Sequence, residues 1–398
     1  RIGGAYLNAY GITRLKKVTL SANLSYANGN LLPQENHGFR EIFYHSDNQT
    51  GRLLSETKQK VGFDYGDVNL NLSWEPSVND LFTLSASYNG IDAKIKDFRS
   101  INRRYDSEGM LLWNDNSNSS GYMKNQNVTV NASFQHNFRP ENNNLTFSYL
   151  FNFGGNELDI LNRYDEGWEA FRLYPLLHNN NYNLTREHTI QADYINGFGG
   201  NRHQLETGGK AIFRHNGTFS YSKEGNTVGN LENINDAQVV MSQIQNVYAL
   251  YGAYTGKFDK ITTIAGVRYE HTHLGIDYRH GNTPDFRTNL NDIVPNAAVS
   301  YNFGPATNIR LAYQMRISRP GLFQVNPYKQ NALGYIIQAG NPDLKSEHSN
   351  NVNLTFSKFG RIFGGNIGIE YNHVGNMIAE YKYLENNILV STYGNLGT

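Results

Sequence analysis

Residues 127–138, NVTVNASFQHNF, decide the fold class of this chain. The even positions are mostly apolar and the odd positions are all polar: Val128, Val130, Ala132, Phe134, His136 and Phe138 alternate with Asn127, Thr129, Asn131, Ser133, Gln135 and Asn137. Successive side chains of a β-strand point to opposite faces of its sheet, so this segment has one apolar and one polar face. We therefore predict a strand that separates an apolar environment from a polar one.

The same alternation recurs along the chain, while helical spacing is absent over any comparable window, which predicts an all-β fold. After the turn that follows residue 138, for example, it restarts at Leu145 and continues to Phe153. Strands are expected near residues 2–12, 15–27, 61–74, 81–98, 125–138, 145–155, 185–196, 203–213, 244–258, 261–279, 293–303, 308–316, 348–359, 362–381 and 388–396.

The connections between these strands alternate between tight and long. Tight turns are expected at residues 13–14, 75–80, 139–144, 197–202, 259–260, 304–307 and 360–361. Long loops are expected at 28–60, 99–124, 156–184, 214–243 and 317–347, with shorter ones at 280–292 and 382–387. Short turns on one side of a membrane and long loops on the other are typical of outer-membrane barrels. We therefore predict an antiparallel transmembrane β-barrel in the bacterial outer membrane, in contact with its lipid.

Composition excludes several other classes of protein. The 398 residues hold 35 Lys and Arg against 35 Asp and Glu, so no basic surface for nucleic acid is expected. The chain has no cysteine, which excludes disulfides, thiolate metal sites and cysteine nucleophiles. It also lacks any run of about 18 apolar residues, so no transmembrane helix is expected.

A bilayer also predicts where aromatic and charged side chains lie. Aromatic residues that flank the tight turns should form a girdle at the membrane boundary: Trp74, Phe82, Phe138, Phe198, Phe258, Phe303, Phe359 and Phe363. His136 should be interfacial. Hydrocarbon does not solvate charge, so these residues should face the lumen: Lys94, Glu206, Lys210, Arg268, Glu270, Arg310 and Arg316.

The number of strands predicts an incomplete barrel. About 15 strands are expected, whereas bacterial single-chain barrels use even numbers, and lipid does not tolerate an open sheet edge. We therefore expect residues 1–398 to be one barrel domain that forms most of a larger wall. The alternative is an error of one strand, with a closed barrel of about 14 or 16.

Two segments carry a family resemblance. Residues 313–320 read YQMRISRP and residues 340–347 read GNPDLKSE. They resemble signatures of TonB-dependent outer-membrane receptors, and the chain is most similar to the outer membrane β-barrel family of Bacteroidetes. The resemblance implies a barrel of about 22 strands, a plug domain that these residues lack, the TonB complex, and uptake of an unidentified nutrient. It also makes a surface lipoprotein a conceivable partner.

The motif residues are expected to anchor a loop rather than to bind a ligand: Arg316, Arg319, Pro320, Asn341, Pro342, Leu344 and Glu347. Arg316 and Arg319 lie where a strand should leave the membrane, and Glu347 lies where the next one should re-enter it. We therefore expect an ion pair at the barrel rim between these arginines and Glu347. Pro320, Pro327 and Pro342 should stop strand pairing there.

No catalytic motif occurs in the chain, so we predict no enzyme, no catalytic residue and no cofactor. His271 and His273 share one strand face, but no third metal ligand is evident, and they are interpreted as polar residues of the lumen or rim. Asp115 with Asn114, Asn116 and Asn118 is interpreted as part of an Asn-rich surface loop and not as a metal site.

Aromatic residues of the long loops are candidates for stacking on sugar rings or other flat ligands, although packing between loops is the alternative: Tyr105, Trp113, Tyr164, Trp168, Phe171, Tyr174 and Tyr335. The leading functional hypothesis is the barrel of an energy-coupled nutrient importer. The alternatives are a passive porin-like channel, and a surface adhesin or structural barrel of an envelope complex.

Overall fold

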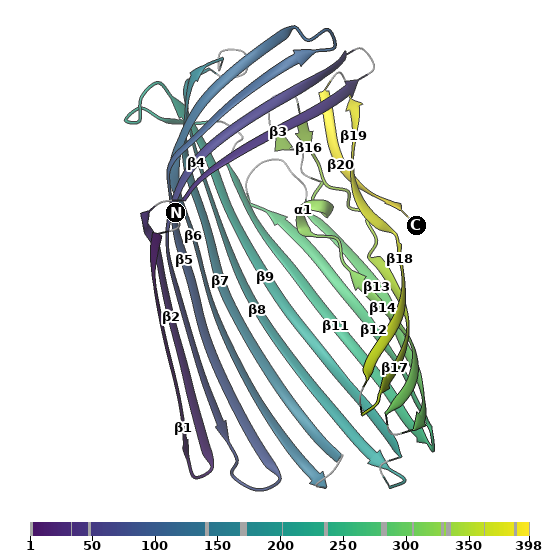
Figure 1. Cartoon of the computed structure of the whole chain (residues 1–398). Helices are drawn as coiled ribbons and strands as arrows, with labels where there is room; N and C mark the ends of the chain where they lie inside the picture. Colours follow the sequence, from purple (N-terminus) through teal and green to yellow (C-terminus); the bar gives the residue numbers. More distant parts are fainter. Residues whose placement is uncertain are drawn as a thin grey trace.

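The computed structural model shows a chain folded almost entirely as β-strands (Figure 1). It describes residues 3–32, 34–46, 49–139, 143–167, 173–200, 202–234, 238–279, 285–304, 306–327, 330–331, 336–361, 363–385 and 388–397. Among the helices of these residues, none is long and apolar enough to cross a membrane. The predicted all-β class is confirmed.

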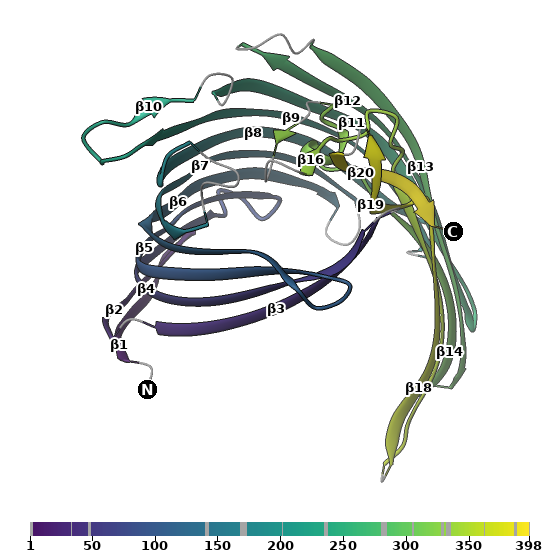
Figure 2. The same ribbon diagram turned by 90° about the horizontal axis from the view of Figure 1, so that it is seen from above.

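The main sheet, which we call the wall, has 16 strands, of which β3 (Gln34–Ser46) and β10 (Glu232–Asn233) attach to the sides of β4 and β9. Its path runs through β1 (Gly3–Leu15), β2 (Val18–Leu32), β4 (Gln49–Trp74), β5 (Asp80–Asp106), β6 (Leu111–Arg139), β7 (Asn143–Glu166), β8 (Leu176–Phe198), β9 (His203–Gly225), β11 (Val239–Phe258), β12 (Ile261–Tyr278), β13 (Phe286–Gly304), β14 (Thr307–Ser318), β17 (Glu347–Phe359) and β18 (Gly364–Gly375). Its pairings are antiparallel, as predicted. Within the described residues, β1 pairs only with β2 and β18 only with β17, so the wall is curved and has two edges (Figure 2).

The prediction of long loops is wrong for most of these segments, because the neighbouring strands continue through them. Residues 99–124 belong largely to β5 and β6, and residues 28–60 largely to β2, β3 and β4. The predicted loops at 156–184 and 214–243 likewise contain the ends of β7, β8, β9 and β11. Both faces of these extensions are rich in polar residues, so the period-two signal fades while the backbone ladder continues.

Two further boundaries differ from the prediction. The first tight turn lies at Lys16-Lys17 rather than at residues 13–14, and Lys16 has a φ of 54°. The strand predicted at 362–381 is divided into β18 and β19 (Met377–Glu385) by Asn376, which has a φ of 57°. Asparagine adopts this left-handed conformation more readily than most residues do, so it permits the chain to leave the wall here.

A second sheet contains β15 (Gln330–Asn331), β16 (Ile336–Gln338), β20 (Ile388–Gly397) and β19, in that order. In this sheet β16 and β20 pair in parallel. The strand predicted at 388–396 therefore exists as β20 but does not extend the wall. The short helix α1 (Leu322–Val325) and β16 lie on the concave side of the wall (Figures 1 and 2).

The two faces of the wall differ in polarity, as the alternation predicts. Arg319, which precedes α1 on the concave side, contacts Glu270 and Thr272 of β12. The even positions of β12 therefore face inward, and the intervening Val267 and Tyr269 face outward with 52% and 45% of their surface exposed. Register with neighbouring strands extends this outward apolar band through Leu70, Leu84, Ile190, Leu250, Ile293 and Leu311.

Aromatic rings gather where this band meets the tight turns. Trp74 and Phe82 flank the turn between β4 and β5, with 5.4 Å between their ring centroids, and Phe134 lies 4.5 Å from Phe82. His136 of the same region bonds to Asp80 at 2.7 Å. Such a cluster agrees with the predicted girdle, because aromatic rings favour the boundary between hydrocarbon and water.

The prediction that all the named charged residues face inward is wrong for Lys94. An unbroken register from Phe82 to Lys94 places both side chains on the outward face. Lys94 follows the outward Tyr88 by six residues, beyond the apolar band, where an outward charge need not enter hydrocarbon. The same parity argument places Arg268 and Glu270 inward, as predicted.

Candidate functional site

The connection from β14 to β17 forms the candidate site, and we call residues 319–346 the luminal segment. It contains the last two residues of the first sequence motif and all but the last residue of the second. Its described part includes α1, β15 and β16, and Figures 1 and 2 show α1 and β16 on the concave side of the wall. The residues that hold it there come from strands far apart in the sequence.

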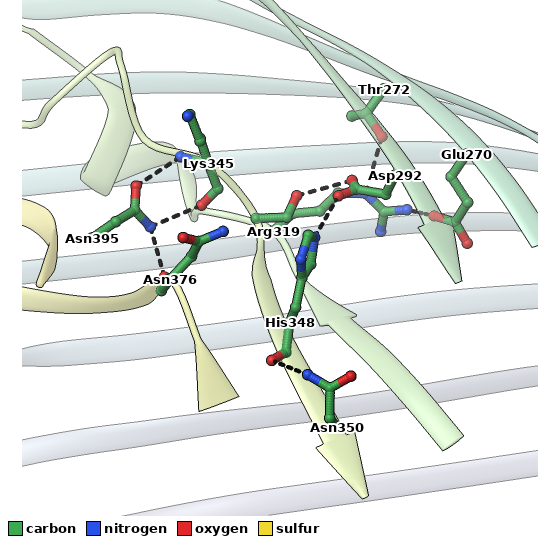
Figure 3. Close-up of polar contacts among 10 residues, drawn as sticks. Glu270, Thr272, Asp292, Arg319, Lys345, His348, Asn350, Asn376 and Asn395 are labelled. Carbon is green, nitrogen blue, oxygen red and sulfur yellow. Dashed lines mark hydrogen bonds and ion pairs between the residues drawn. The ribbon is translucent and has the colours of Figure 1, made fainter. Parts of the chain in front are cut away.

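Arg319 attaches the beginning of the luminal segment to β12 (Figure 3). Its guanidinium group forms an ion pair with Glu270, and its Nε donates to the hydroxyl oxygen of Thr272 at 3.0 Å. The Glu270 side chain is 9% exposed and Thr272 is completely buried. Because a buried carboxylate needs charged or hydrogen-bonding partners, this contact fixes the segment against the wall.

The same carboxylate connects Arg319 to a wider inward-facing network. Arg268 also forms an ion pair with Glu270, and its guanidinium carbon lies 5.2 Å from the ring centroid of Tyr251 on β11. The Tyr251 hydroxyl donates to Asp193 on β8. The network therefore joins the luminal segment to three wall strands through charge-assisted contacts.

A second attachment lies at the end of the luminal segment. Asp292 of β13 is 5% exposed and accepts a hydrogen bond from the Ser346 hydroxyl at 2.9 Å. The ring Nε2 of His348, the second residue of β17, lies 3.1 Å from the other carboxylate oxygen of Asp292 (Figure 3). Asp292 thus secures the return of the chain into the wall.

Gly340 permits the segment to fold onto itself. A Cβ atom at this position would lie 2.5 Å from the carbonyl oxygen and 2.6 Å from the nitrogen of Asn326. Without that atom, the Gly340 N–H donates to the Asn326 carbonyl at 2.7 Å, and the Asn341 N–H donates to the Gln324 carbonyl at 2.6 Å. The glycine of the second motif is therefore required by close backbone packing.

Asparagine side chains connect the segment to β20 and to Asn376, the residue before β19. Asn341 Nδ2 donates to the Tyr393 carbonyl at 3.0 Å. Asn395 accepts from the Lys345 N–H at 2.9 Å and donates to the Asn376 carbonyl at 2.7 Å (Figure 3). Hydrogen bonds to the backbone from both sides hold the second sheet against the luminal segment.

The ion pair predicted between the motif arginines and Glu347 is wrong. Arg319 turns inward to Glu270, while the exposed Arg316 donates to Gln314 at 3.3 Å. Glu347 accepts instead from the Ile378 N–H at 2.6 Å. The motif residues therefore make contacts other than the expected rim ion pair. The reason is that the described part of the segment folds into the lumen rather than along the rim.

The remaining motif residues also lie in this folded region. Pro320 is buried, Pro342 is half-buried, and Leu344 is 2% exposed. Val325 of α1, at 1%, and Val390 of β20, which is fully buried, are further apolar residues of the region. This apolar burial complements the polar attachments of the segment.

The structure describes four of the seven aromatic candidates. Tyr105, Trp113 and Tyr164 belong to β5, β6 and β7 rather than to loops, which corrects their expected setting. The guanidinium carbon of Arg52 lies 5.0 Å from the Tyr105 ring centroid. Tyr174 is half-buried just before β8. Three candidates lie outside the described residues: Trp168, Phe171 and Tyr335.

Two other sequence candidates lie in different settings from those expected. His271 and His273 face outward, which excludes the lumen but not the rim, and they bond to Asn291 and Asn289 of β13 at 2.9 Å each. Asp115 is a buried residue of β6, not of a surface loop, and accepts from Asn102 at 2.7 Å. Across the described part of the chain, no three His, Asp or Glu side chains are grouped to hold a metal ion.

Sequence reasoning missed Thr272, Asp292 and Ser346, and it did not connect Glu270 with Arg319. Glu270 and Asp292 are opposite one another in the β12–β13 register. Strand parity alone would have placed both on one face, but residues 280–292 were expected to be a loop. The sequence analysis lacked the register between β12 and β13, which places Asp292 beside Glu270.

Comparison with known proteins agrees with this architecture. A family model described as the outer membrane protein beta-barrel family matches residues 136–398. No curated protein sequence matches the chain. Among solved structures, the chain resembles the ferric citrate transporter FecA in its unliganded form, with a TM-score of 0.55 and 11% identity over 94% of this chain and 51% of FecA.

Two further structures show the same fold. The copper transporter OprC gives a TM-score of 0.59 and 10% identity, over 98% of this chain and 56% of OprC. The ferric yersiniabactin uptake receptor FyuA from Yersinia pestis gives a TM-score of 0.55 and 11% identity, over 94% of this chain and 54% of FyuA. The chain thus spans little more than half the length of these proteins.

Proposed function

Because this chain belongs to the outer membrane protein beta-barrel family, we propose that it forms the wall of a receptor that imports a nutrient across the bacterial outer membrane in a TonB-dependent manner. The observation that carries the proposal is the luminal segment. Arg319 and Asp292 attach it to the inward face of the wall, so the lumen contains a fixed peptide segment. A passive channel needs an unobstructed path, whereas an energy-coupled receptor opens its path on demand.

The wall supplies the passive part of this function. Its outward face is apolar and its inward face is polar, so it places a water-compatible surface inside the bilayer. Lipid requires partners for the unpaired backbone groups of β1 and β18, so further strands are proposed to complete the barrel. A plug domain and the TonB complex are the proposed moving parts, and a surface lipoprotein is a further proposed partner.

Two measurements on the intact protein test the proposal. In planar bilayers it should show no steady conductance, whereas a variant without the plug should conduct. Cells that express it should accumulate its nutrient only with an intact TonB complex; ferric citrate and copper ions are the first probes, because FecA and OprC transport them. Steady conductance of the intact protein, or uptake that persists without TonB, would favour the passive channel instead.

A further inference from the structure

The tight turns that connect the strands of the wall are basic. Their described residues include five cations and two carboxylates, in a chain whose 35 basic and 35 acidic residues balance. Since the chain as a whole is neutral, this end of the wall carries positive charge that carboxylates elsewhere in the chain compensate. The five cations are all exposed: Lys16, Lys17, Arg202, Lys260 and Arg361.

The protein itself neutralises few of these charges. Of the two turn carboxylates, Glu75 pairs with Arg14 of β1 at 3.2 Å, which leaves Asp259. Lys17 Nζ donates to the Pro76 carbonyl at 2.5 Å, but that group is neutral. Within the part of the chain that the structure describes, none of the five turn cations forms an ion pair. Their charges therefore remain available to an external anion.

Lys358 adds a sixth exposed cation beside the apolar band. It pairs with Thr307 in the β14–β17 register and is the next outward residue after Phe356, on the side of the turn. Phe356 is 39% exposed, and two residues of a strand span about 7 Å. The long Lys358 side chain therefore places its ammonium group where hydrocarbon gives way to headgroups.

The aromatic girdle lies at the same end of the wall. The ring centroids of Tyr301 and Phe303, both outward, lie 4.8 Å apart. The residue between them, Asn302, donates its N–H to the Lys260 carbonyl at 2.8 Å, so these rings adjoin a basic turn. Aromatic rings at the boundary, with basic side chains just beyond them, are typical of residues that anchor a protein in a membrane surface.

We call Lys358 and the five turn cations the basic rim. Short turns of outer-membrane barrels face the periplasm, and the long extensions of β4, β5 and β6 lie at the opposite end of the wall (Figure 1). The basic rim is therefore on the side of the inner leaflet. Its members come from turns spread between β1 and β18, so they meet different places along the lipid boundary.

We propose that the basic rim binds anionic phospholipids of the inner leaflet, with headgroups distributed along it rather than gathered in one pocket. The turn residues lie beyond the ends of both faces of the wall, and electrostatic attraction extends over about 8–10 Å at moderate salt. Each cation near an anionic surface contributes a factor of about five. The proposal depends on the placement of the wall in the membrane and not on the nutrient that it imports.

Nanodiscs that hold the intact protein with equal amounts of phosphatidylglycerol and phosphatidylethanolamine test the proposal. Native mass spectrometry of the released protein counts the lipids that stay bound. Wild-type protein should retain about fivefold more phosphatidylglycerol than phosphatidylethanolamine. A five-site variant should retain the two lipids equally: Lys16→Gln, Arg202→Gln, Lys260→Gln, Lys358→Gln and Arg361→Gln.

Two control variants separate the basic rim from net charge and from side-chain shape. Lys16→Arg, Lys260→Arg and Lys358→Arg together keep the charge and should keep the preference for phosphatidylglycerol. Circular dichroism and heat-dependent gel mobility would verify that every variant is folded. The charge-matched control changes exposed residues beyond the other end of the apolar band and should behave as the wild type does: Arg40→Gln, Lys96→Gln, Arg99→Gln, Arg163→Gln and Arg279→Gln.

Three results would overturn the proposal. The first is equal retention of both lipids by the wild type, and the second is an unchanged preference in the folded five-site variant. The third is full displacement of phosphatidylglycerol by an equal concentration of inorganic phosphate, which would show recognition of a free anion and not of a lipid. Retention under phosphate, together with loss of the preference in about 1 M salt, where the screening length falls to about 3 Å, supports the proposal.

Discussion

Arg319 and Glu270 form an ion pair that joins the luminal segment to β12. Arg268 shares the same carboxylate, so one buried acidic side chain serves one arginine of the wall and one of the segment. Removal of Glu270 would leave two arginines without their shared partner, whereas removal of Arg319 would leave Glu270 paired with Arg268. The two residues are therefore not equivalent in their effect on stability.

Glu270→Ala should lower the free energy of unfolding by about 3 kcal/mol, the usual cost of breaking a buried ion pair. Arg319→Ala should cost less, because Arg268 still neutralises Glu270. Glu370→Ala is the control, since Glu370 is an exposed inward residue of β18 and should cost less than about 1 kcal/mol. Urea unfolding in lipid vesicles measures all three, and equal costs for Glu270 and Glu370 would contradict the proposed anchor.

Gly340→Ala should release the luminal segment, because the added Cβ would lie 2.5 Å from the Asn326 carbonyl oxygen and force the backbone apart. Hydrogen exchange should become faster at the amides of Gly340 and Asn341, at a cost of about 2 kcal/mol. Gly365→Ala, with open space around its Cβ, should leave the exchange unchanged. Identical exchange in both variants would show that the segment tolerates a side chain at residue 340.

Leu311→Arg should prevent stable insertion, because Leu311 is 46% exposed on the outward face of β14 and an arginine near the bilayer midplane costs about 2–4 kcal/mol. Ala312→Arg is the matched control on the inward face, where water solvates the charge. The fraction folded in vesicles, measured from heat-dependent gel mobility, distinguishes the two. Equal folding would mean that the outward face does not contact hydrocarbon.

Brominated acyl chains should quench the fluorescence of Trp74 but not that of Trp113. Trp74 is 43% exposed beside a tight turn at the edge of the apolar band. Trp113 lies in the part of β6 that extends beyond the band. Variants that retain one tryptophan at a time allow the comparison in vesicles, and strong quenching of Trp113 would require a different position of the membrane.

Sequence patterns predicted the part of the fold that depends on contact with lipid. In β6, Val128 and Val130 alternate with polar neighbours because only one face meets hydrocarbon, so strand and faces were both predictable. The extension around Asp115 was taken for a loop because both of its faces are polar. The backbone hydrogen bonds between this extension and β5 nevertheless continue. The side chains show no apolar–polar alternation that would indicate a strand.

The candidate site was predictable in some of its residues but not in its contacts. The motif identified Arg319 and Asn341 as residues that anchor a connection, and the cost of charge in lipid placed Glu270 inward. The partner predicted for Arg319 was Glu347, which lies at the end of the same connection. The residue with which Arg319 pairs depends on the direction in which the connection folds. The spacing of residues along the chain does not indicate that direction.

The sequence by itself determined an all-β wall with an apolar outer face, because alternation is a local property that follows from strand geometry and the cost of charge in lipid. The tertiary structure alone decided that the described part of residues 319–346 enters the lumen, that Arg319 meets Glu270, and that Ser346 meets Asp292. These contacts depend on strand register and on the curvature of the wall. Both are set by the packing of residues far apart in the chain, which no single segment encodes.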